Sequence, residues 1–484
     1  MERPVTIEAD LAVVGAGGAG LYTALTAAAA GARVALVSAT PLAESSSYWA
    51  QGGLAAALAI DDSPERHLED TLTSGRGTTK LSAAQALTNE APDVVHDLER
   101  LGVHFDADRR GRLALGLEGG HSVRRIVHAG GSATGRRVSR QLSALAAADD
   151  RIEVLEESRA TAVLTLDGRA AGVRLHDGRL VVARAVVLAT GGAAAMWSRS
   201  TNPVGATGSG MLLAQRAGAA LADLEMVQFH PTAVAGVDGA DSFLVTEAVR
   251  GEGALLLDAD GERFVDELLP RDAVSRAVAR KMIETGAPSV GLDMRAIDPD
   301  LFPNVVSVLR RAGLDPTRDL IPVAPAAHYM MGGIATDLHG RSTLPALYAV
   351  GECACTGLHG ANRLASNSLS ECFVFGRRAA QAALDEPALT GTPLPPPSSP
   401  PPRLTAASRE ALWHEAGIER DADGLRKLLD DEHPLVRLVA ASALAREESR
   451  GAHQRRDFPR VNADLDGHHT VVTSDAAPSL VFWR

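Results

Sequence analysis

The spacing of apolar positions changes several times within the first forty residues. Apolar residues run without a break from Leu11 to Val14, a pattern that predicts a buried strand. Glycines follow at positions 15, 17 and 20, and an Ala-rich stretch that continues to about Gly31 favours a helix. The apolar run RVALVS comes next. This order predicts a strand, a Gly-rich turn, a helix and a second strand, which form a βαβ unit.

Residues 152–192 alternate apolar and polar positions, and two Asp-Gly pairs interrupt the alternation. This pattern is typical of antiparallel strands joined by tight turns, so the segment is predicted to be a β-meander. It ends in AVVLATGG, a buried strand that leads into a Thr-Gly-Gly loop. The later run ALYAVGE has the same character. Three separate strands are therefore expected to deliver loops to one cofactor.

After residue 225 the pattern becomes mixed, with short strands, a helix at about 272–284 and another near 299–312. This segment is interpreted as a domain inserted into the dinucleotide fold, which residues 330–385 complete. The stretch TGTPLPPPSSPPPR has no packing pattern and predicts a semi-rigid linker. Residues 404–450 have helical periodicity, and the chain after them is irregular in pattern.

Together these patterns predict an α/β protein with a Rossmann-like domain, an inserted α+β domain and a C-terminal helical domain. The expected boundaries are residues 1–225 and 330–390 for the two parts of the Rossmann-like domain, 226–329 for the insertion, 391–403 for the linker and 404–484 for the helical domain.

The three early glycines have the GxGxxG spacing of dinucleotide-binding turns. A Gly-rich turn without a ligand is the alternative, but the position directly after a strand and within a βαβ unit favours a pyrophosphate. Such sites often have an acidic residue at the end of the second strand to bind the ribose. This strand ends at Ser38 and Ala39, so Ser38, the backbone or a residue from elsewhere is expected to hold the ribose.

Composition narrows the class of protein. The net charge of −12 argues against a nucleic-acid surface. The three cysteines, Cys353, Cys355 and Cys372, include no CxxC pair, and a disulfide framework is not expected. No apolar run reaches the length of a membrane span, and the N-terminus lacks the pattern of a signal peptide. A cytoplasmic protein without a membrane partner is expected.

Six short Gly-rich segments concentrate polar side chains. Each candidate has a structural alternative, such as a buried histidine with satisfied hydrogen bonds or an arginine paired at a helix start, and His121 is assigned to the structural class. No metal-binding pattern and no GxSxG nucleophile pattern occurs. Arginine and histidine side chains suit a dianionic substrate. The candidates are Glu118, His121, His230, Thr246, Glu247, Arg271, His328 and Arg363.

These segments also occur together in a known family. The chain contains SSSYWAQGGLAAAL, QFHPT, TEAVRGEG, PRDAVSRA, PAAHYMMGGI and GLHGANRLASNSLSEC, in order. Over roughly residues 7–385 it resembles the succinate dehydrogenase/fumarate reductase flavoprotein family. The resemblance implies FAD as the cofactor, an FAD-binding Rossmann-like domain and a capping domain as the insertion.

The resemblance further implies how FAD is held. Members that attach FAD covalently use a histidine five residues before the Gln of AQGG, and Ser46 stands at that position, which implies non-covalent FAD. Ser209 stands where an acid is common. The residues implied to contact FAD are Ala16, Gly17, Gly18, Ala19, Ser46, Ser47, Tyr48, Trp49, Ala50, Gln51, Gly52, Gly53, Ser209, Glu352, Ser368 and Leu369.

Roles in substrate binding follow from the same resemblance. Arg363 matches the arginine that binds a substrate carboxylate, and His230 and His328 match its partners. Thr246 and Glu247 match a substrate-contacting loop. Arg271 matches the arginine that exchanges a proton with substrate; because its pKa is high, it needs neighbouring carboxylates, for which Glu247 and Asp272 are candidates.

The segment EGGHS, with Glu118, resembles the aspartate-oxidising members of the family. An unpaired buried ammonium is costly, so an acid at this position favours an amino dicarboxylate over a plain one. The resemblance implies oxidation of L-aspartate to iminoaspartate, with O2 or fumarate as electron acceptor and quinolinate synthase as metabolic partner. A soluble fumarate reductase and a non-catalytic FAD-binding subunit are the alternatives.

Overall fold

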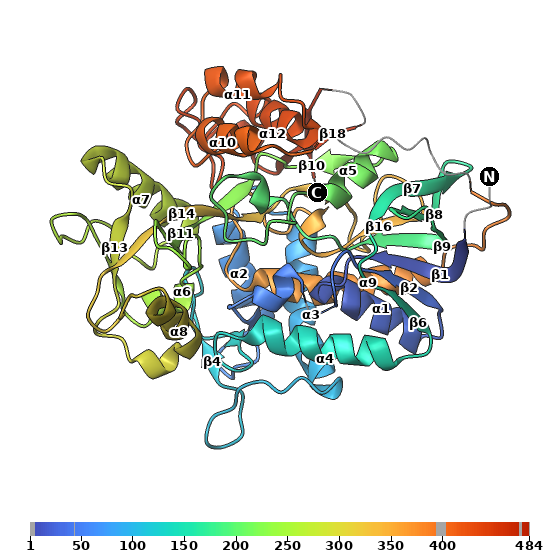
Figure 1. Cartoon of the computed structure of the whole chain (residues 1–484), viewed down its shortest axis with the longest axis horizontal. Coiled ribbons are helices and arrows are strands. Elements are labelled where there is room, and N and C mark those ends of the chain that lie inside the picture. The colour runs from blue at the N-terminus through green and yellow to red at the C-terminus, as the bar shows by residue number, and fades with distance from the viewer. Residues whose placement is uncertain (1–4, 43, 394–402, 474–476, 484) are drawn as a thin grey trace.

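The N-terminal βαβ unit predicted from the sequence is confirmed. The computed structural model describes residues 5–42, 44–393, 403–473 and 477–483. The unit consists of β1 (Thr6–Val14), α1 (Gly18–Ala29) and β2 (Val34–Val37). Figure 1 shows this part of the chain beside a smaller lobe that contains α7 and β13, with the C-terminal helices over both.

The parallel strands of the main sheet end at one edge. Val14 of β1 is level with Val37 of β2 and with Leu188 of β9 (Leu180–Leu188). β16 (Leu347–Ala349) also pairs in parallel with β9, and its Ala349 is level with Leu188. The loops after β1, β9 and β16 therefore emerge side by side, as the sequence predicted, and this is where α/β sheets bind ligands.

One strand of the predicted meander has a different partner. β7 (Ala160–Leu166), β8 (Arg169–Leu175) and β9 are antiparallel, as predicted. β6 (Ile152–Leu155), which was assigned to the same meander, instead pairs in parallel with β2. The helix α4 (Thr134–Ala148) precedes β6 and forms the connection that parallel pairing requires. Alternation of apolar and polar residues indicates a strand, but it does not determine which strand it pairs with.

Helices cover the sheet with close contacts. Thr23 Oγ1 of α1 donates a hydrogen bond to the carbonyl oxygen of Gly376, 3.3 Å away. A Cβ at Gly376 would lie 3.0 Å from the same Thr23 oxygen, so a larger residue would push the helices apart. The other helices of this region are α2 (Pro64–Ser74), α3 (Leu81–Arg100), α5 (Ser209–Arg216) and α9 (Asn367–Leu384).

The inserted segment forms a second, antiparallel sheet in the order β11-β14-β13-β12, with short helices around it (Figure 1). The helix expected at 272–284 is α7, and the one expected near 299–312 begins as the 3₁₀ turn η3 (Pro299–Leu301). The elements are β11 (Val227–Val234), α6 (Glu247–Gly251), β12 (Leu255–Leu257), α7 (Arg271–Thr285), β13 (Val290–Asp293), α8 (Pro303–Arg311) and β14 (Ile321–Met330).

The C-terminal segment is helical only in its first half. α10 (Ala406–Glu415), α11 (Ala422–Leu428) and α12 (Pro434–Ala445) agree with the prediction. The irregular-looking end instead contains β18 (His468–Val472) and β19 (Ser479–Phe482), and β18 pairs with β10 (Leu221–Ala222). The end of the chain, which the sequence pattern left irregular, thus forms two paired strands. Most of the predicted linker lies outside the described residues.

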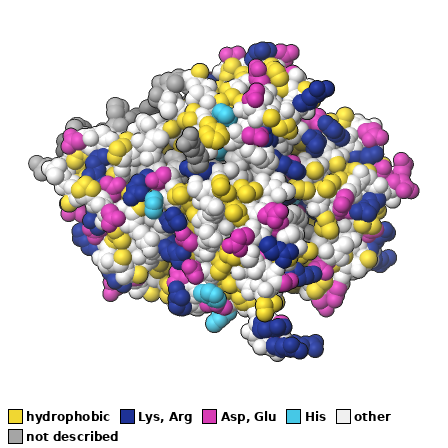
Figure 2. Space-filling model, turned by 180° about the vertical axis from the view of Figure 1, so that it is seen from behind, with side chains coloured by type: hydrophobic (Ala, Val, Ile, Leu, Met, Phe, Trp, Pro, Cys, Tyr) yellow, Lys and Arg dark blue, Asp and Glu magenta, His cyan; other side chains and the backbone are white. Residues whose placement is uncertain are grey.

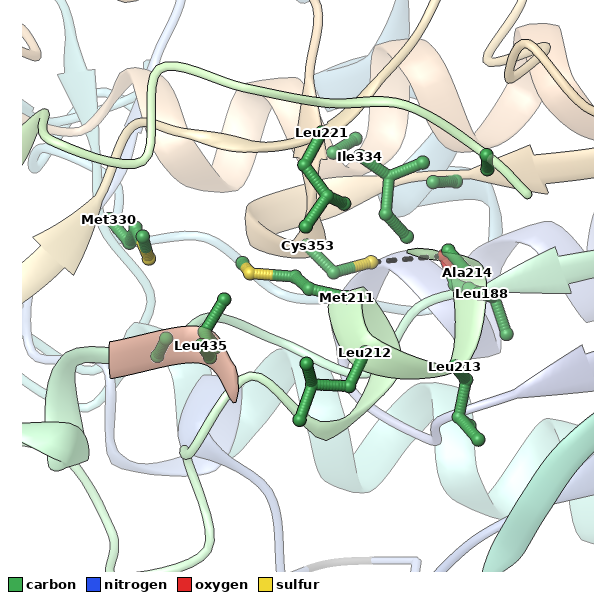
Figure 3. Packing of buried hydrophobic residues seen from close by; sticks show 14 of the residues in the cluster. Leu188, Met211, Leu212, Leu213, Ala214, Leu221, Met330, Ile334, Cys353 and Leu435 are labelled. Atoms are coloured by element: carbon green, nitrogen blue, oxygen red, sulfur yellow. Dashed lines mark hydrogen bonds between the residues drawn. The ribbon is translucent and has the colours of Figure 1, made fainter. Parts of the chain in front are cut away.

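Figure 3 shows how the C-terminal helices share a core with the main sheet. Leu435 of α12 packs beside Met211 of α5 in one apolar cluster with Leu221 and Ile334. Cys353 Sγ donates a hydrogen bond to the carbonyl oxygen of Leu188, which belongs to the same cluster, at 3.1 Å. The remaining short elements are η1 (Ser46–Trp49), β3 (Leu54–Ala55), β4 (Leu115–Gly116), β5 (Ile126–Val127), η2 (Ala194–Met196), β15 (Gly333–Ala335), η4 (Gly351–Cys353), β17 (Ala354–Cys355) and η5 (Ala463–Leu465).

The surface has mixed charge over the face seen in Figure 2, apart from a projecting tip with several cationic side chains. All three cysteines are free thiols. In the part of the chain that the structure describes, no helix combines the length and the apolar character needed to cross a bilayer.

Candidate active site

The Gly-rich turn after β1 leaves no room for a side chain at Gly15 or Gly20. Gly15 has φ +113°, and a Cβ there would lie 2.2 Å from the carbonyl oxygen of Ala189. A Cβ at Gly20 would lie 1.8 Å from the carbonyl oxygen of Gly15. Ala16, Gly17 and the following residues thus place backbone amides at the N-terminus of α1, where a phosphate is stabilised.

The loop expected to wrap the cofactor packs against this turn. Ser47 Oγ of η1 accepts a hydrogen bond from the backbone N–H of Gly18 at 3.0 Å. At its other end, the Gly53 N–H donates to Ser366 Oγ at 3.2 Å, just before α9. The structure therefore brings Ser46–Gly53 between the starts of α1 and α9. The Trp49 side chain is 62% exposed, so it projects away from this contact.

Other residues expected at the cofactor occupy the neighbouring strand ends. Ser38 is buried after β2, where its hydroxyl donates to the carbonyl oxygen of Thr40 at 2.6 Å. Glu352 follows β16 and accepts from the Met330 N–H at 3.0 Å. Burial raises the pKa of Glu352 to about 7. Ser209 is exposed at the first residue of α5. Ser38 and Glu352 therefore lie where strands of the main sheet end, whereas Ser209 lies at the surface on α5.

The arrangement fits a dinucleotide. Gln51 Oε1 and Thr190 Oγ1 are buried in these loops, and neither has a hydrogen-bond partner among the described residues. Buried polar atoms without partners are costly, so a polar ligand that satisfies them is the consistent explanation. Ser368 and Leu369 lie at the start of α9, after Ser366 with its left-handed φ of 60°.

A second cluster brings together three residues far apart in sequence. His230 of β11 and His328 of β14 have ring centroids 5.2 Å apart. Their pKa values lie well below 6.5 because of burial and the charge of Arg271, so both rings are neutral at pH 7. His230 Nδ1 accepts from the Thr232 N–H at 3.3 Å, which leaves its buried Nε2 as a donor without a partner in the described structure.

Arg363, the third member, is buried before α9. Its Nη1 donates to Ser368 Oγ at 3.0 Å, and its Nε has no hydrogen-bond partner among the described residues. Burial, together with the charge of Arg271, lowers the pKa of Arg363 to about 10, so it remains a cation at pH 7. Gln228 donates to the Arg363 carbonyl oxygen at 2.8 Å and accepts from Arg271 Nη1 at 3.2 Å, so the two arginines belong to one site.

Arg271 is the first residue of α7 and is held from two sides. Its Nε donates to Glu247 Oε2 at 2.5 Å, and its Nη1 donates to Gln228 Oε1 at 3.2 Å. Glu247 also forms a 3.5 Å ion pair with Arg250. Burial alone would raise the pKa of Glu247, but the two arginines lower it below 4.5. The result is a buried row of alternating charge, Arg271–Glu247–Arg250.

The other carboxylate proposed to assist Arg271 has a different partner. Asp272 accepts two hydrogen bonds from Arg76, at 3.1 and 3.2 Å. Thr246 is buried directly before α6, and its side chain forms no capping hydrogen bond. Asp272 thus anchors the start of α7, whereas Glu247 contacts Arg271.

Glu118 is buried between the cofactor loop and α9. Its Oε2 accepts from Ser366 Oγ at 2.7 Å, and a Cβ at Gly52 would lie 3.6 Å from its Oε1. His121 has partners at both ring nitrogens, the Ala365 carbonyl oxygen at 2.9 Å and Arg125 Nη1 at 3.2 Å, in agreement with a structural role. Glu118 keeps an acidic group within the electrostatic range of Arg363.

Two residues at this site were not predicted. Gln228 contacts Arg271 and the Arg363 backbone, and Tyr329 lies beneath the Arg363 guanidinium. A signal for Gln228 exists in QFHPT, because it stands two residues before His230 and faces the same side of a strand. Tyr329 gives no such signal, because an aromatic residue in a strand is ordinarily part of the core.

Comparisons with known proteins agree with this geometry. Residues 10–369 match the family model for an FAD binding domain, and residues 429–481 match that for the fumarate reductase flavoprotein C-terminus. A quinol-fumarate reductase structure with menaquinol superposes with a TM-score of 0.88 at 29% identity, covering 100% of this chain and 98% of that chain. Mycobacterium smegmatis Sdh1 in complex with UQ1 gives 0.83 at 31% identity, covering 99% and 94%.

These matches define the class as FAD-binding flavoproteins. Among curated relatives, the L-aspartate oxidase of Caulobacter vibrioides is 46% identical over 97% of this chain and 97% of its own length. That of Streptomyces coelicolor is 43% identical, covering 96% of this chain and 91% of its own. The chain belongs to the L-aspartate oxidase family.

Proposed function

We propose that the protein oxidises L-aspartate to iminoaspartate with non-covalently bound FAD. The observation that supports this most is the composition of the second cluster, a buried cation and two neutral histidines with Glu118 as the acid nearby. When bound, FAD supplies the acceptor for the electron pair that the substrate loses. The protein itself binds and orients the substrate and exchanges protons with it.

Binding would use complementary charge. Arg363 presents donors to a carboxylate, and His230 Nε2 adds a neutral donor from β11. Glu118 would accept from the substrate ammonium, which a plain dicarboxylate lacks. Arg271 would exchange a proton with substrate, and Glu247 would hold its guanidinium in place through the 2.5 Å contact. Thr246 would contact the substrate from the same loop as Glu247.

The wider assignment belongs to the same proposal. Ser46 stands at the position of the covalent histidine, in agreement with free FAD. Residues 1–225 and 330–390 would bind FAD, and residues 226–329 would cap the substrate. Residues 404–484 would cover one side of the FAD-binding domain. We infer O2 or fumarate as electron acceptor, quinolinate synthase as the enzyme that consumes the product in NAD biosynthesis, and a cytoplasmic location.

Anaerobic photometry tests this function. L-aspartate added to the FAD-loaded protein should bleach the yellow flavin absorbance, whereas succinate at the same concentration should leave it unchanged. Bleaching by succinate instead would favour a dehydrogenase or fumarate reductase. No bleaching by either compound would favour a non-catalytic FAD-binding subunit. Denaturation with acid should release all of the flavin, since no bond to the polypeptide is expected.

A further inference from the structure

The buried arginines around the substrate position differ in what holds them. Arg271 and Arg250 both contact the Glu247 carboxylate. Arg363 forms no ion pair with any described residue, although only 4% of its surface is exposed. Instead, its guanidinium carbon lies 4.5 Å from the centre of the Tyr329 ring. A cation over an aromatic face at this distance is attracted by the ring quadrupole.

The Tyr329 ring is itself fixed by hydrogen bonds. Its hydroxyl donates to Glu371 Oε2 at 2.8 Å and lies 3.2 Å from His359 Nε2. His359 Nε2 contacts the same Glu371 oxygen at 2.9 Å. Because all three side chains are buried, the ring has no freedom to turn its edge toward Arg363. Burial, and next the charge of Glu371, raise the pKa of Tyr329 well above 10, so it is a neutral phenol.

The strand ladder ties this ring to the rest of the site. Tyr329 of β14 is the register partner of Gln228 of β11. Gln228 Nε2 donates to the carbonyl oxygen of Arg363 at 2.8 Å, and its Oε1 accepts from Arg271. One cross-strand pair therefore holds Arg363 at two points, its backbone through Gln228 and its guanidinium through Tyr329.

We propose that Tyr329 is a positioning residue for dicarboxylate binding, whose ring fixes the Arg363 guanidinium without neutralising it. A carboxylate in this place would fix the arginine equally well, but it would compete with the substrate carboxylate for the same N–H groups. An aromatic ring attracts the cation without occupying an N–H donor as a carboxylate would, and the Nε of Arg363 has no hydrogen-bond partner among the described residues. The inference rests on the proposed role of Arg363.

Paired substitutions separate the ring from the hydroxyl. In the FAD-loaded protein, Tyr329→Leu should raise KM for L-aspartate roughly 10- to 30-fold, the loss expected for a desolvated cation–π contact, with kcat within about threefold. Tyr329→Phe keeps the ring and should stay within about threefold of wild type in KM. Flavin content and Tm report folding, and Tyr329→Met, which keeps the bulk without a ring, replaces Tyr329→Leu if that variant does not fold.

A double substitution tests whether the effect passes through Arg363. In an Arg363→Gln background, which has no cation over the ring, Tyr329→Leu should change KM by less than about threefold, because non-additivity marks a shared interaction. Equal KM for Tyr329→Leu and wild type, equal losses in the Leu and Phe variants, or full additivity would each overturn the inference. Succinate binding, measured by perturbation of the flavin spectrum, gives the same comparison without turnover. A wild-type protein that binds succinate but does not oxidise L-aspartate would refute the proposed function and leave this inference testable.

Discussion

At the scale of single residues, the candidate site separates charges that neutralise one another from charges left for a ligand. Glu247 lies between Arg271 and Arg250 and forms an ion pair with each of them. Arg363 is a buried cation without an acidic partner among the described residues, and Glu118 is a buried acid that accepts a hydrogen bond from the neutral Ser366 hydroxyl. A ligand with both carboxylate and ammonium groups would compensate both.

Substitution of Glu118 tests this complementarity. Glu118→Gln should lower kcat/KM for L-aspartate by roughly 100-fold, because the substrate ammonium would be buried without its acid. Binding of succinate should be unchanged or tighter, since it carries no ammonium. Steady-state kinetics and competitive inhibition by succinate measure the two effects. Ser366→Ala keeps the acid and serves as the control. An unchanged kcat/KM in Glu118→Gln would contradict the ammonium assignment.

The Glu352 carboxyl predicts a pH dependence of stability for the FAD-free protein. Burial raises its pKa from 4.5 to about 7, so between these values the folded state binds more protons than the unfolded state. Stability contributed by this group is therefore lost as pH rises through that window. Urea unfolding between pH 5 and 8 should show a downward slope that Glu352→Gln reduces. Equal slopes in both proteins would show that the carboxyl is already ionised.

At the scale of elements, local patterns predicted strands and helices better than their partners. The βαβ unit followed from apolar spacing and Gly15, because a φ of +113° demands glycine. The parallel pairing of β6 and the strands β18 and β19 were missed, because pairing is set by contacts distant in sequence. In the same way, of the two carboxylates that the motifs offered as neighbours of Arg271, Glu247 contacts it, whereas Asp272 contacts Arg76.

The Arg76–Asp272 pair sets the position of α7, and so of Arg271 at its start. Arg76 is a non-glycine residue with φ 57°, and both its guanidinium contacts go to Asp272. Asp272→Asn should weaken this anchor and lower kcat about 10-fold, as expected when a reacting group is misplaced, while FAD content stays constant. Asp423→Asn removes an exposed acid from the first turn of α11 and should leave kcat unchanged. Wild-type kcat in Asp272→Asn would argue against the anchor.

At the scale of the whole molecule, charged contacts join the C-terminal segment to the inserted lobe and to the main domain. Arg280 of α7 pairs with Glu419 at 2.7 Å, and this contact is largely exposed. The contact with the main domain is buried: Arg446, directly after α12, pairs with Glu225 at 2.8 Å, and it also pairs with Glu448 of its own segment at 3.0 Å. All three buried side chains have 0% exposure. Exposed pairs contribute little to stability, whereas a buried charge that loses its partner is costly.

This contrast yields a prediction for the molecule as a unit. Arg446→Met would leave Glu225 buried without its cation, whereas Glu448 would keep Arg450, and it should lower the free energy of unfolding by about 3–5 kcal/mol. Arg426→Met removes an arginine whose partner Asp423 is 92% exposed, and it should cost less than about 1 kcal/mol. Urea unfolding of both variants measures the difference, and KM for L-aspartate should stay at the wild-type value in each, because neither arginine contacts the candidate substrate site. Equal stability losses would mean that the C-terminal segment is held by its apolar cluster alone, and that its charges do not fix it to the flavin domain.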